Sequence, residues 1–332
     1  MPNITHARTR TRTRTRTHAH ALARTRSQHV YVYDVTLSSV VSTVELPTPV
    51  LDTAYSADGA HLAAATLEGV LAVADVSRPA AAPVASLMAP AAGEAMSQVA
   101  YAGEAAAFVT GSWDGSLGMW DPRVGVRSAS ASAPGKVYAL DISGHRVVAA
   151  TAGRHVYVYD VRNFSEPVQK RESSLKHQTR AVAASPSGDG FALSSIEGRV
   201  AIEYFDPEPA IQARKFAFKC HRAKPDPVKG TPAIAYPVNA LAFHPTHGTL
   251  ATGGCDACIN VWDPAHKRRL ASFGPFQTSL AALAFSPSGD ALALATSYTF
   301  ELGERDAPPD AIFVMPVTDA KFKSRGPKGK KK

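Results

Sequence analysis

The stretch from Thr110 to Arg123 reads TGSWDGSLGMWDPR, and it decides the fold of this protein. Apolar side chains alternate with other residues around Asp114-Gly115, and an Asp-Gly pair between two such runs is a strong hairpin signal. A two-residue turn of the primed type needs positive φ at both central positions, which Asp and Gly tolerate. The sequence therefore predicts two antiparallel strands between Thr110 and Asp121.

The same hairpin pattern recurs along most of the chain with different residues. Copies of the unit precede and follow turns at Glu68-Gly69, at Gly153, at Gly198 and at 255–258. A repeat near 40 residues is typical of four-stranded propeller blades, which cannot bury both faces alone and must stack around an axis. The aspartates that end successive copies lie roughly 40 residues apart, at Asp75, Asp121 and Asp160.

A further alternating strand stands upstream of each hairpin and ends in a polar turn. These segments are 51–59, 137–144, 182–188, 238–244 and 280–289. An all-β sandwich with coincidental turns is the alternative, but the tandem spelling favours a propeller. We expect an all-β, seven-bladed WD40-type β-propeller. Its first blade should be incomplete. His29–Asp34 has the sequence pattern of the last strand of a blade hairpin, and no segment with the pattern of the earlier strands precedes it.

The two ends of the chain differ from the repeats. We expect residues 1–27 to be a disordered low-complexity extension, 28–320 the propeller, and 321–332 a basic tail. Residues 1–27 alternate Thr with Arg and His with Ala, so we expect that a simple repeat in the gene, or a mistaken gene model, has replaced the true start. A transit peptide is disfavoured because two-residue alternation makes no amphipathic helix. Residues 79–92 and 223–235 are predicted to be an outer loop and an insertion.

Composition excludes several classes of protein. No run approaches the roughly 18 apolar residues of a membrane span, and Cys220, Cys255 and Cys258 are too few for a disulfide framework. Cys255 and Cys258 have metal-ligand spacing, but no second pair completes a tetrahedral site, so they read as turn residues. The net charge of +8 comes largely from the two ends of the chain. Without a groove-reading motif, this charge predicts no specific nucleic-acid partner.

Several stretches are not generic blade sequence, and in them the chain resembles a known family. They are TGSWDG from Thr110, RESSLKHQTR from Arg171, SSIEGRVAIEY from Ser194, and KFAFKCHR from Lys215. The family is that of the WD-repeat spindle-checkpoint proteins of the budding-uninhibited-by-benzimidazoles class. The resemblance is dense from about Phe108 to Asp319 and absent before Ser27.

The resemblance implies a non-enzymatic adaptor without a cofactor. Family members hold a short segment of checkpoint kinases or pseudokinases and dock it on phosphorylated threonines of a kinetochore scaffold. It further implies a nuclear protein that reaches the kinetochore in mitosis, as a monomer within a hetero-complex and without a membrane partner. Carried over by position, Arg199 pairs with acidic side chains of the kinase segment, and Lys219 faces the phosphothreonine. Basic side chains suit a phosphothreonine, which carries close to two negative charges and three acceptor oxygens.

Four further residues are weaker candidates. Trp113 occupies the turn of its hairpin, where an aromatic side chain either anchors a partner or packs within the blade. Arg180 and Tyr204 are assigned to the kinase segment, and Arg222 to the phosphothreonine. By contrast, Trp120 and Trp262 end hairpins, and a structural role is expected for both.

Other functions leave weaker traces in the sequence. We find no HExxH, GxxxxGK[ST] or GxSxG motif, so nothing supports an enzyme. A nucleoporin-binding propeller of messenger-RNA export shares parts of the same motifs and is the first alternative. Trp120-Asp121-Pro122-Arg123 fits the pattern of substrate receptors for cullin-type ubiquitin ligases, which is the second.

Overall fold

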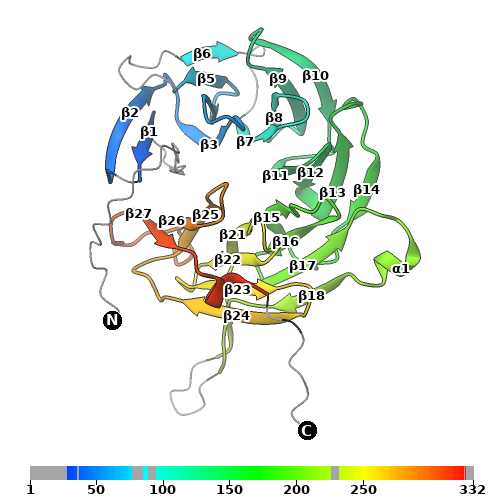
Figure 1. The fold of residues 1–332 in the computed structure, drawn as a ribbon, viewed down its shortest axis with the longest axis vertical. Coiled ribbons are helices and arrows are strands. Elements are labelled where there is room, and N and C mark those ends of the chain that lie inside the picture. The colour runs from blue at the N-terminus through cyan, green and yellow to red at the C-terminus, as the bar shows by residue number, and fades with distance from the viewer. Residues whose placement is uncertain are drawn as a thin grey trace.

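The structure is a computed structural model that describes residues 28–35, 37–76, 85–88, 95–225, 232–324 and 326. In these residues the chain is built from antiparallel sheets arranged around a central axis (Figure 1). The only helices among them are single turns: η1 (Ala152–Arg154), α1 (Pro209–Gln212) and α2 (Asp319–Phe322). The expected all-β class is therefore confirmed.

Five sheets have four strands, and the order along the chain is also the order across each sheet. The first two are β3 (Val50–Tyr55), β4 (His61–Thr66), β5 (Leu71–Asp75) and β6 (Ala85–Met88), then β7 (Met96–Ala102), β8 (Ala107–Ser112), β9 (Ser116–Asp121) and β10 (Val126–Ser132). The next two are β11 (Val137–Ser143), β12 (Arg146–Thr151), β13 (His155–Asp160) and β14 (Gln169–Glu172), then β15 (Thr179–Ala184), β16 (Gly190–Ser195), β17 (Arg199–Tyr204) and β18 (Phe216–Lys219). The fifth is β21 (Val238–Phe243), β22 (Leu250–Gly254), β23 (Ile259–Asp263) and β24 (Arg268–Phe273).

The sixth sheet has three strands, β25 (Leu280–Phe285), β26 (Ala291–Thr296) and β27 (Ala311–Pro316). A separate two-stranded sheet holds β1 (His29–Asp34) and β2 (Ser39–Glu45). The described residues thus form six blades, and the expectation of seven is wrong. The two strands at the seventh position are not a blade, because β1 has no strand paired on its inner side among these residues.

The core lies between neighbouring blades rather than inside any one of them. Val148 and Val158 of one sheet, for example, pack against Phe191, Leu193 and Ala201 of the next, and all five are buried. Alternation along each strand places side chains on both faces of the sheet, so each blade contacts a neighbour on either side. The repeat seen in the sequence is therefore the unit that stacks.

The hairpin predicted between Thr110 and Asp121 is present, but its turn differs from the prediction. β8 and β9 pair as expected, and the turn spans Trp113, Asp114 and Gly115. Of these, only Gly115 has positive φ, at 90°, so the two-residue primed turn is wrong. A Cβ atom at position 115 would lie 2.4 Å from the carbonyl oxygen of Ala133, so glycine is needed here for space as well as for conformation.

The tryptophans of the W-D endings are structural, as expected. Trp262 donates from Nε1 to Thr252 Oγ1 at 3.1 Å, and that hydroxyl lies 2.8 Å from Nε2 of His221. His221 is buried, and its Nδ1 lies 2.7 Å from a carboxylate oxygen of Asp256. These bonds tie the segment before one blade to the second and third strands of that blade.

The two predicted insertions have different outcomes. Residues 79–92 were expected to form a loop, yet residues 85–88 within them form the outer strand β6; the remainder lies outside the described residues. The insertion at 223–235 begins and ends in a small antiparallel pair, β19 (Arg222–Ala223) and β20 (Ile234–Ala235). Residues 1–27 also lie outside the described part of the chain, and of the basic tail 321–332 the structure describes 321–324 and 326.

Candidate binding face of the propeller

The predicted site residues are distributed over two faces of the ring. We call the face on which the first and third strands of each blade begin the upper face; the turns between second and third strands open there, because neighbouring strands are antiparallel. Trp113 lies in such a turn, and Arg199 is the first residue of the third strand β17. Most candidate residues therefore lie on the upper face.

A depression of about 480 Å³ opens on the upper face between several blades. Trp113 and Arg180, two of the residues predicted to contact the partner segment, both line it. Its remaining lining residues are Val50, Leu51, Ser97, Gln98, Lys136, Tyr138, Gln178 and Thr179.

Trp113 presents part of its ring at the rim of this depression. The residue is 36% exposed, and Lys136 Nζ lies 5.7 Å from the ring centroid, a cation–π distance. Trp120 and Trp262 instead have their indole nitrogens bonded to threonine hydroxyls within the blades. The position of Trp113 therefore suits an anchor for a partner better than a packing residue.

Arg180 is held in place at the start of β15. Its Nε donates to Asn239 Oδ1 at 3.1 Å, and Asn239 donates in turn to the carbonyl oxygen of Leu280 at 3.0 Å. These contacts join three consecutive blades at the inner rim. Arg180 also lines the depression, so a cationic residue has a defined place on its wall.

A second group of charges surrounds Glu197 in the turn before β17. Arg222 Nη2 donates to Glu197 Oε1 at 2.7 Å, Arg199 Nε lies 3.5 Å from Oε2, and His177 Nε2 lies 3.3 Å from Oε2. The hydrogen bond from Arg222 is the largest of the effects that lower the pKa of Glu197. One carboxylate thus gathers three basic side chains at the edge of the upper face.

Lys219 lies directly beside this group. It is the cross-strand partner of Arg199 in the β17–β18 pair, and its side chain is exposed. Phe216 and Phe218 point into the blade interface, where the Phe218 ring centroid lies 4.7 Å from that of Trp262. In the sequence, Phe216 and Phe218 alternate with Lys215, Ala217 and Lys219, which predicts an exposed Lys219, and the structure confirms this alternation. Arg199 and Lys219, both assigned from the family resemblance, are neighbours.

The remaining two candidates have other surroundings. Arg222 donates from Nη2 to both the backbone carbonyl oxygen and the carboxylate of Glu197. Tyr204 is the last residue of β17, so it lies at the lower face, with the Arg214 guanidinium 4.9 Å from its ring. The structure therefore does not bring Tyr204 together with the other five candidates.

Four residues of this face were not singled out from the sequence: Lys136, Tyr138, Gln178 and Glu197. Lys136 and Tyr138 flank the start of β11, and period-two alternation alone shows that their side chains share a face. That this face borders Trp113 depends on blade stacking, which no local pattern contains.

Other kinds of site find little support in the described part of the chain. It contains no group of three or more His, Cys, Asp or Glu side chains placed to hold a metal ion. Its three cysteines are free, and burial raises the pKa of the Cys220 thiol to about 12. No helix in it is long and apolar enough to cross a membrane.

The WDPR tetrapeptide has a local structural explanation. Arg123 donates from Nε and Nη2 to the carboxylate of Asp121, at 2.9 and 2.6 Å. Arg162 makes the same pair with Asp160 at the end of the next blade, at 2.9 and 2.5 Å. Because the same Asp–Arg pair closes the corresponding turn of the next blade, the tetrapeptide does not by itself indicate a substrate receptor of a ubiquitin ligase.

Comparison with known proteins first defines the class. Residues 231–263 match the family described as "WD domain, G-beta repeat", in agreement with the blades. The chain is 36% identical over 224 residues to a Schizosaccharomyces pombe protein named "Poly(A)+ RNA export protein", which covers 67% of this chain and 62% of that protein. It is thus a WD-repeat β-propeller.

Two other relatives identify the family more narrowly. The chain is 50% identical over 232 residues to "Mitotic checkpoint protein BUB3.1" of Arabidopsis thaliana, covering 68% of this chain and 67% of that protein. It is 42% identical over 227 residues to "Mitotic checkpoint protein bub3" of Dictyostelium discoideum, with the same coverage. The chain belongs to the BUB3 family of mitotic checkpoint proteins. The resemblance noted from its motifs is confirmed, and a checkpoint role is favoured over the export and ligase alternatives.

Proposed function

We propose that this protein is a non-enzymatic adaptor of the spindle assembly checkpoint. A short segment of a checkpoint kinase or pseudokinase lies across the upper face, and the complex docks on phosphothreonine motifs of a kinetochore scaffold. The protein acts in the nucleus and, in mitosis, at the kinetochore, as one copy within a hetero-complex.

One observation carries this proposal: a depression on the upper face is lined by both Trp113 and Arg180. An exposed aromatic ring beside fixed cations suits a peptide that presents an apolar side chain next to acidic ones. Arg199 extends the positive charge toward the rim. Lys219 beside Arg199 then provides the cation for a phosphate, as a charge-assisted hydrogen bond requires.

The substitution Arg199→Glu tests the kinase segment. It places a negative charge where we expect the partner's acidic side chain, so we expect affinity for a synthetic kinase-segment peptide to fall by about 2 to 4 kcal/mol. Isothermal titration calorimetry measures the loss, and circular dichroism checks the fold. Arg127→Glu is the matched control, because Arg127 is an exposed arginine on the outer strand β10.

Unchanged affinity in a folded Arg199→Glu protein would remove Arg199 from the site. Co-purification separates the alternatives: checkpoint kinases support the adaptor, a nucleoporin the export factor, and cullin adaptor subunits the ligase receptor.

A further inference from the structure

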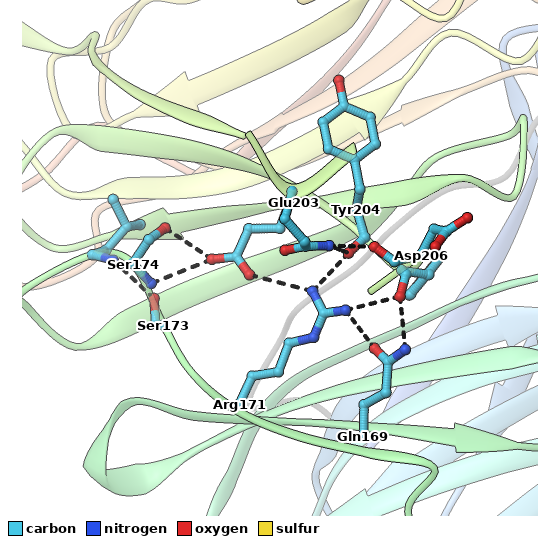
Figure 2. A network of polar contacts seen from close by, with 10 residues as sticks. Gln169, Arg171, Ser173, Ser174, Glu203, Tyr204 and Asp206 are labelled. Carbon is cyan, nitrogen blue, oxygen red and sulfur yellow. Dashed lines mark hydrogen bonds and ion pairs between the residues drawn. The ribbon is translucent and has the colours of Figure 1, made fainter. Parts of the chain in front are cut away.

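Two stretches that distinguish this chain from generic blades also contain residues with no role assigned so far in binding. Arg171, Ser173 and Ser174 lie in the stretch that ends at Arg180, and Glu203 lies in the stretch that contains Arg199. They are about 30 residues apart in sequence, yet the structure brings them together between the sheet β11–β14 and the sheet β15–β18 (Figure 2).

Arg171 connects the outer strand β14 to the end of β17. Its Nη1 donates to the carbonyl oxygen of Tyr204 at 2.7 Å, and its Nη2 donates to that of Phe205 at 3.0 Å. Nη2 also donates to Gln169 Oε1 at 2.6 Å, and Gln169 Nε2 donates to Phe205 O at 2.7 Å. A single guanidinium thus binds the end of the next blade's third strand.

Glu203 carries the connection from this buried point to an exposed segment. Its side chain is 5% exposed, and Oε2 lies 3.8 Å from Arg171 Nη1. Its other oxygen, Oε1, accepts from Ser174 Oγ at 2.8 Å and from Ser174 N at 3.2 Å (Figure 2). A buried carboxylate needs such donors, so the geometry of Ser174 is closely determined.

Ser174 lies at the start of the segment 173–180, which we call the crossing segment, because it runs from β14 to the start of β15. Further along it, Leu175 O accepts from Arg154 Nη1 at 3.2 Å, and His177 pairs with Glu197. Its last residues, Gln178 to Arg180, line the depression beside Trp113. One end is therefore fixed between blades and the other forms the binding face.

We infer that Glu203, acting through Ser174, is a positioning residue that holds the crossing segment so that Arg180 stays on the wall of the depression. A preordered segment binds a partner with less loss of conformational freedom than a mobile one. This inference rests on the proposed function, because it concerns the same upper face.

The substitution Ser174→Ala tests the inference at an exposed position that packing does not depend on. We expect it to weaken binding of a synthetic kinase-segment peptide three- to tenfold at temperatures where the protein stays folded. The melting temperature should fall only modestly, because Glu203 loses one donor but keeps Ser174 N. Hydrogen–deuterium exchange should become faster in residues 175–180. Ser165→Ala is the control, since Ser165 is also exposed and also bonded to a neighbouring side chain, Asn163 Oδ1 at 3.3 Å, but lies outside the crossing segment.

A double-mutant cycle decides whether Ser174 acts through Arg180. If it does, adding Ser174→Ala to Arg180→Ala produces no further loss; multiplying losses overturn the inference. Glu203→Ala removes the carboxylate that neutralises Arg171, so we expect it to destabilise the contact between the two blades. Glu203→Gln retains an oxygen that accepts from Ser174, so it should bind within about twofold of the parent protein.

Trp113→Ala separates the two levels of the proposal. If Trp113→Ala weakens the peptide and Ser174→Ala does not, the positioning role is wrong and the binding face stands. If Trp113→Ala and Arg180→Ala both leave affinity unchanged, the proposed face itself is wrong and the inference falls with it.

Discussion

Lys219 is the single residue on which the phosphate proposal depends. Its exposed ammonium stands beside Arg199 on a rigid strand. Lys219→Ala is expected to cost about 1 to 3 kcal/mol toward a phosphothreonine peptide and almost nothing toward the unphosphorylated one, as for a charge-assisted hydrogen bond. The difference should shrink as salt rises, because the site is exposed.

Fluorescence polarisation with paired peptides at low and high salt measures this effect. Lys215→Ala is the matched control, since Lys215 is exposed and immediately precedes β18. Equal losses for both peptides would show that Lys219 supports the blade and does not read phosphate.

Asp141 is a second residue with a measurable signature. It borders the cavity at the ring axis and accepts backbone hydrogen bonds from Ala184 at 2.8 Å and from Ile142 at 2.8 Å. Burial is the main cause that raises its pKa to about 6, with a smaller contribution from the charge of Asp52. The carboxyl group therefore keeps its proton to a higher pH in the folded state than in the unfolded chain.

This raised pKa predicts a particular dependence of stability on pH. The contribution of Asp141 to the free energy of unfolding is full below about pH 4 and is lost as pH rises through about 6, by an amount on the order of 1 to 3 kcal/mol. Asp141→Asn should remove this loss of stability. The free energy of unfolding of the variant should therefore rise relative to that of the parent protein between pH 4.5 and pH 7.5. Urea unfolding of both proteins at pH 4.5 and at pH 7.5 measures this difference. The same change in the free energy of unfolding for both proteins would contradict the prediction.

At the scale of the element, the blade hairpin is stabilised by threonines bonded to tryptophans. Thr252 connects Trp262 and His221 and is fully buried, whereas Thr110 accepts only from Trp120 Nε1, at 2.9 Å. Removing a hydroxyl leaves its buried partners unsatisfied, at about 1 to 3 kcal/mol each. The blade β21–β24 should therefore depend more strongly on Thr252 than the blade β7–β10 depends on Thr110.

The isosteric pair Thr252→Val and Thr110→Val tests this comparison. We expect Thr252→Val to lower the free energy of unfolding by about 3 kcal/mol and Thr110→Val by about half as much. Chemical denaturation provides both numbers in one experiment. Equal losses would mean that His221 finds another partner or contributes nothing.

At the scale of the whole molecule, the ring is least complete beside β27. Ile312 and Val314 of β27 are 40% and 41% exposed, whereas Phe313 and Met315 on its other face pack into the neighbouring core. A blade in a stacked ring normally covers both faces. The exposed apolar face is the consequence of having only two strands, β1 and β2, at the seventh position.

Restoring a full first blade should therefore stabilise the ring. We expect a variant in which two strands designed to pair on the inner side of β1 replace residues 1–27 to melt several degrees higher than the present chain. Burial of apolar surface such as Ile312 and Val314 supplies the gain. Differential scanning calorimetry compares the two proteins, and equal melting temperatures would mean that the face is already covered.

The sequence alone determined the repeat, the blade strands and the strand alternation at Lys219. These follow from local rules: period-two alternation, turn residues at regular intervals, and a spacing near one blade length. Prediction from the sequence failed where two local conformations fit the same residues. At Gly115 the turn needs only one positive φ, and at 85–88 a segment expected to be a loop forms a strand. The number of complete blades was also mispredicted, because ring closure is a property of all sheets together.

Only the tertiary structure decided which candidates form a site. It placed Trp113 and Arg180 on one depression, gathered Arg199, Arg222 and Lys219 near Glu197, and separated Tyr204 from both. The physical reason is that a strand's two ends lie on opposite faces of the ring, while residues about 65 positions apart meet through blade stacking. Sequence patterns report the direction of a side chain along its own strand, but the neighbours it meets are set by how the sheets pack.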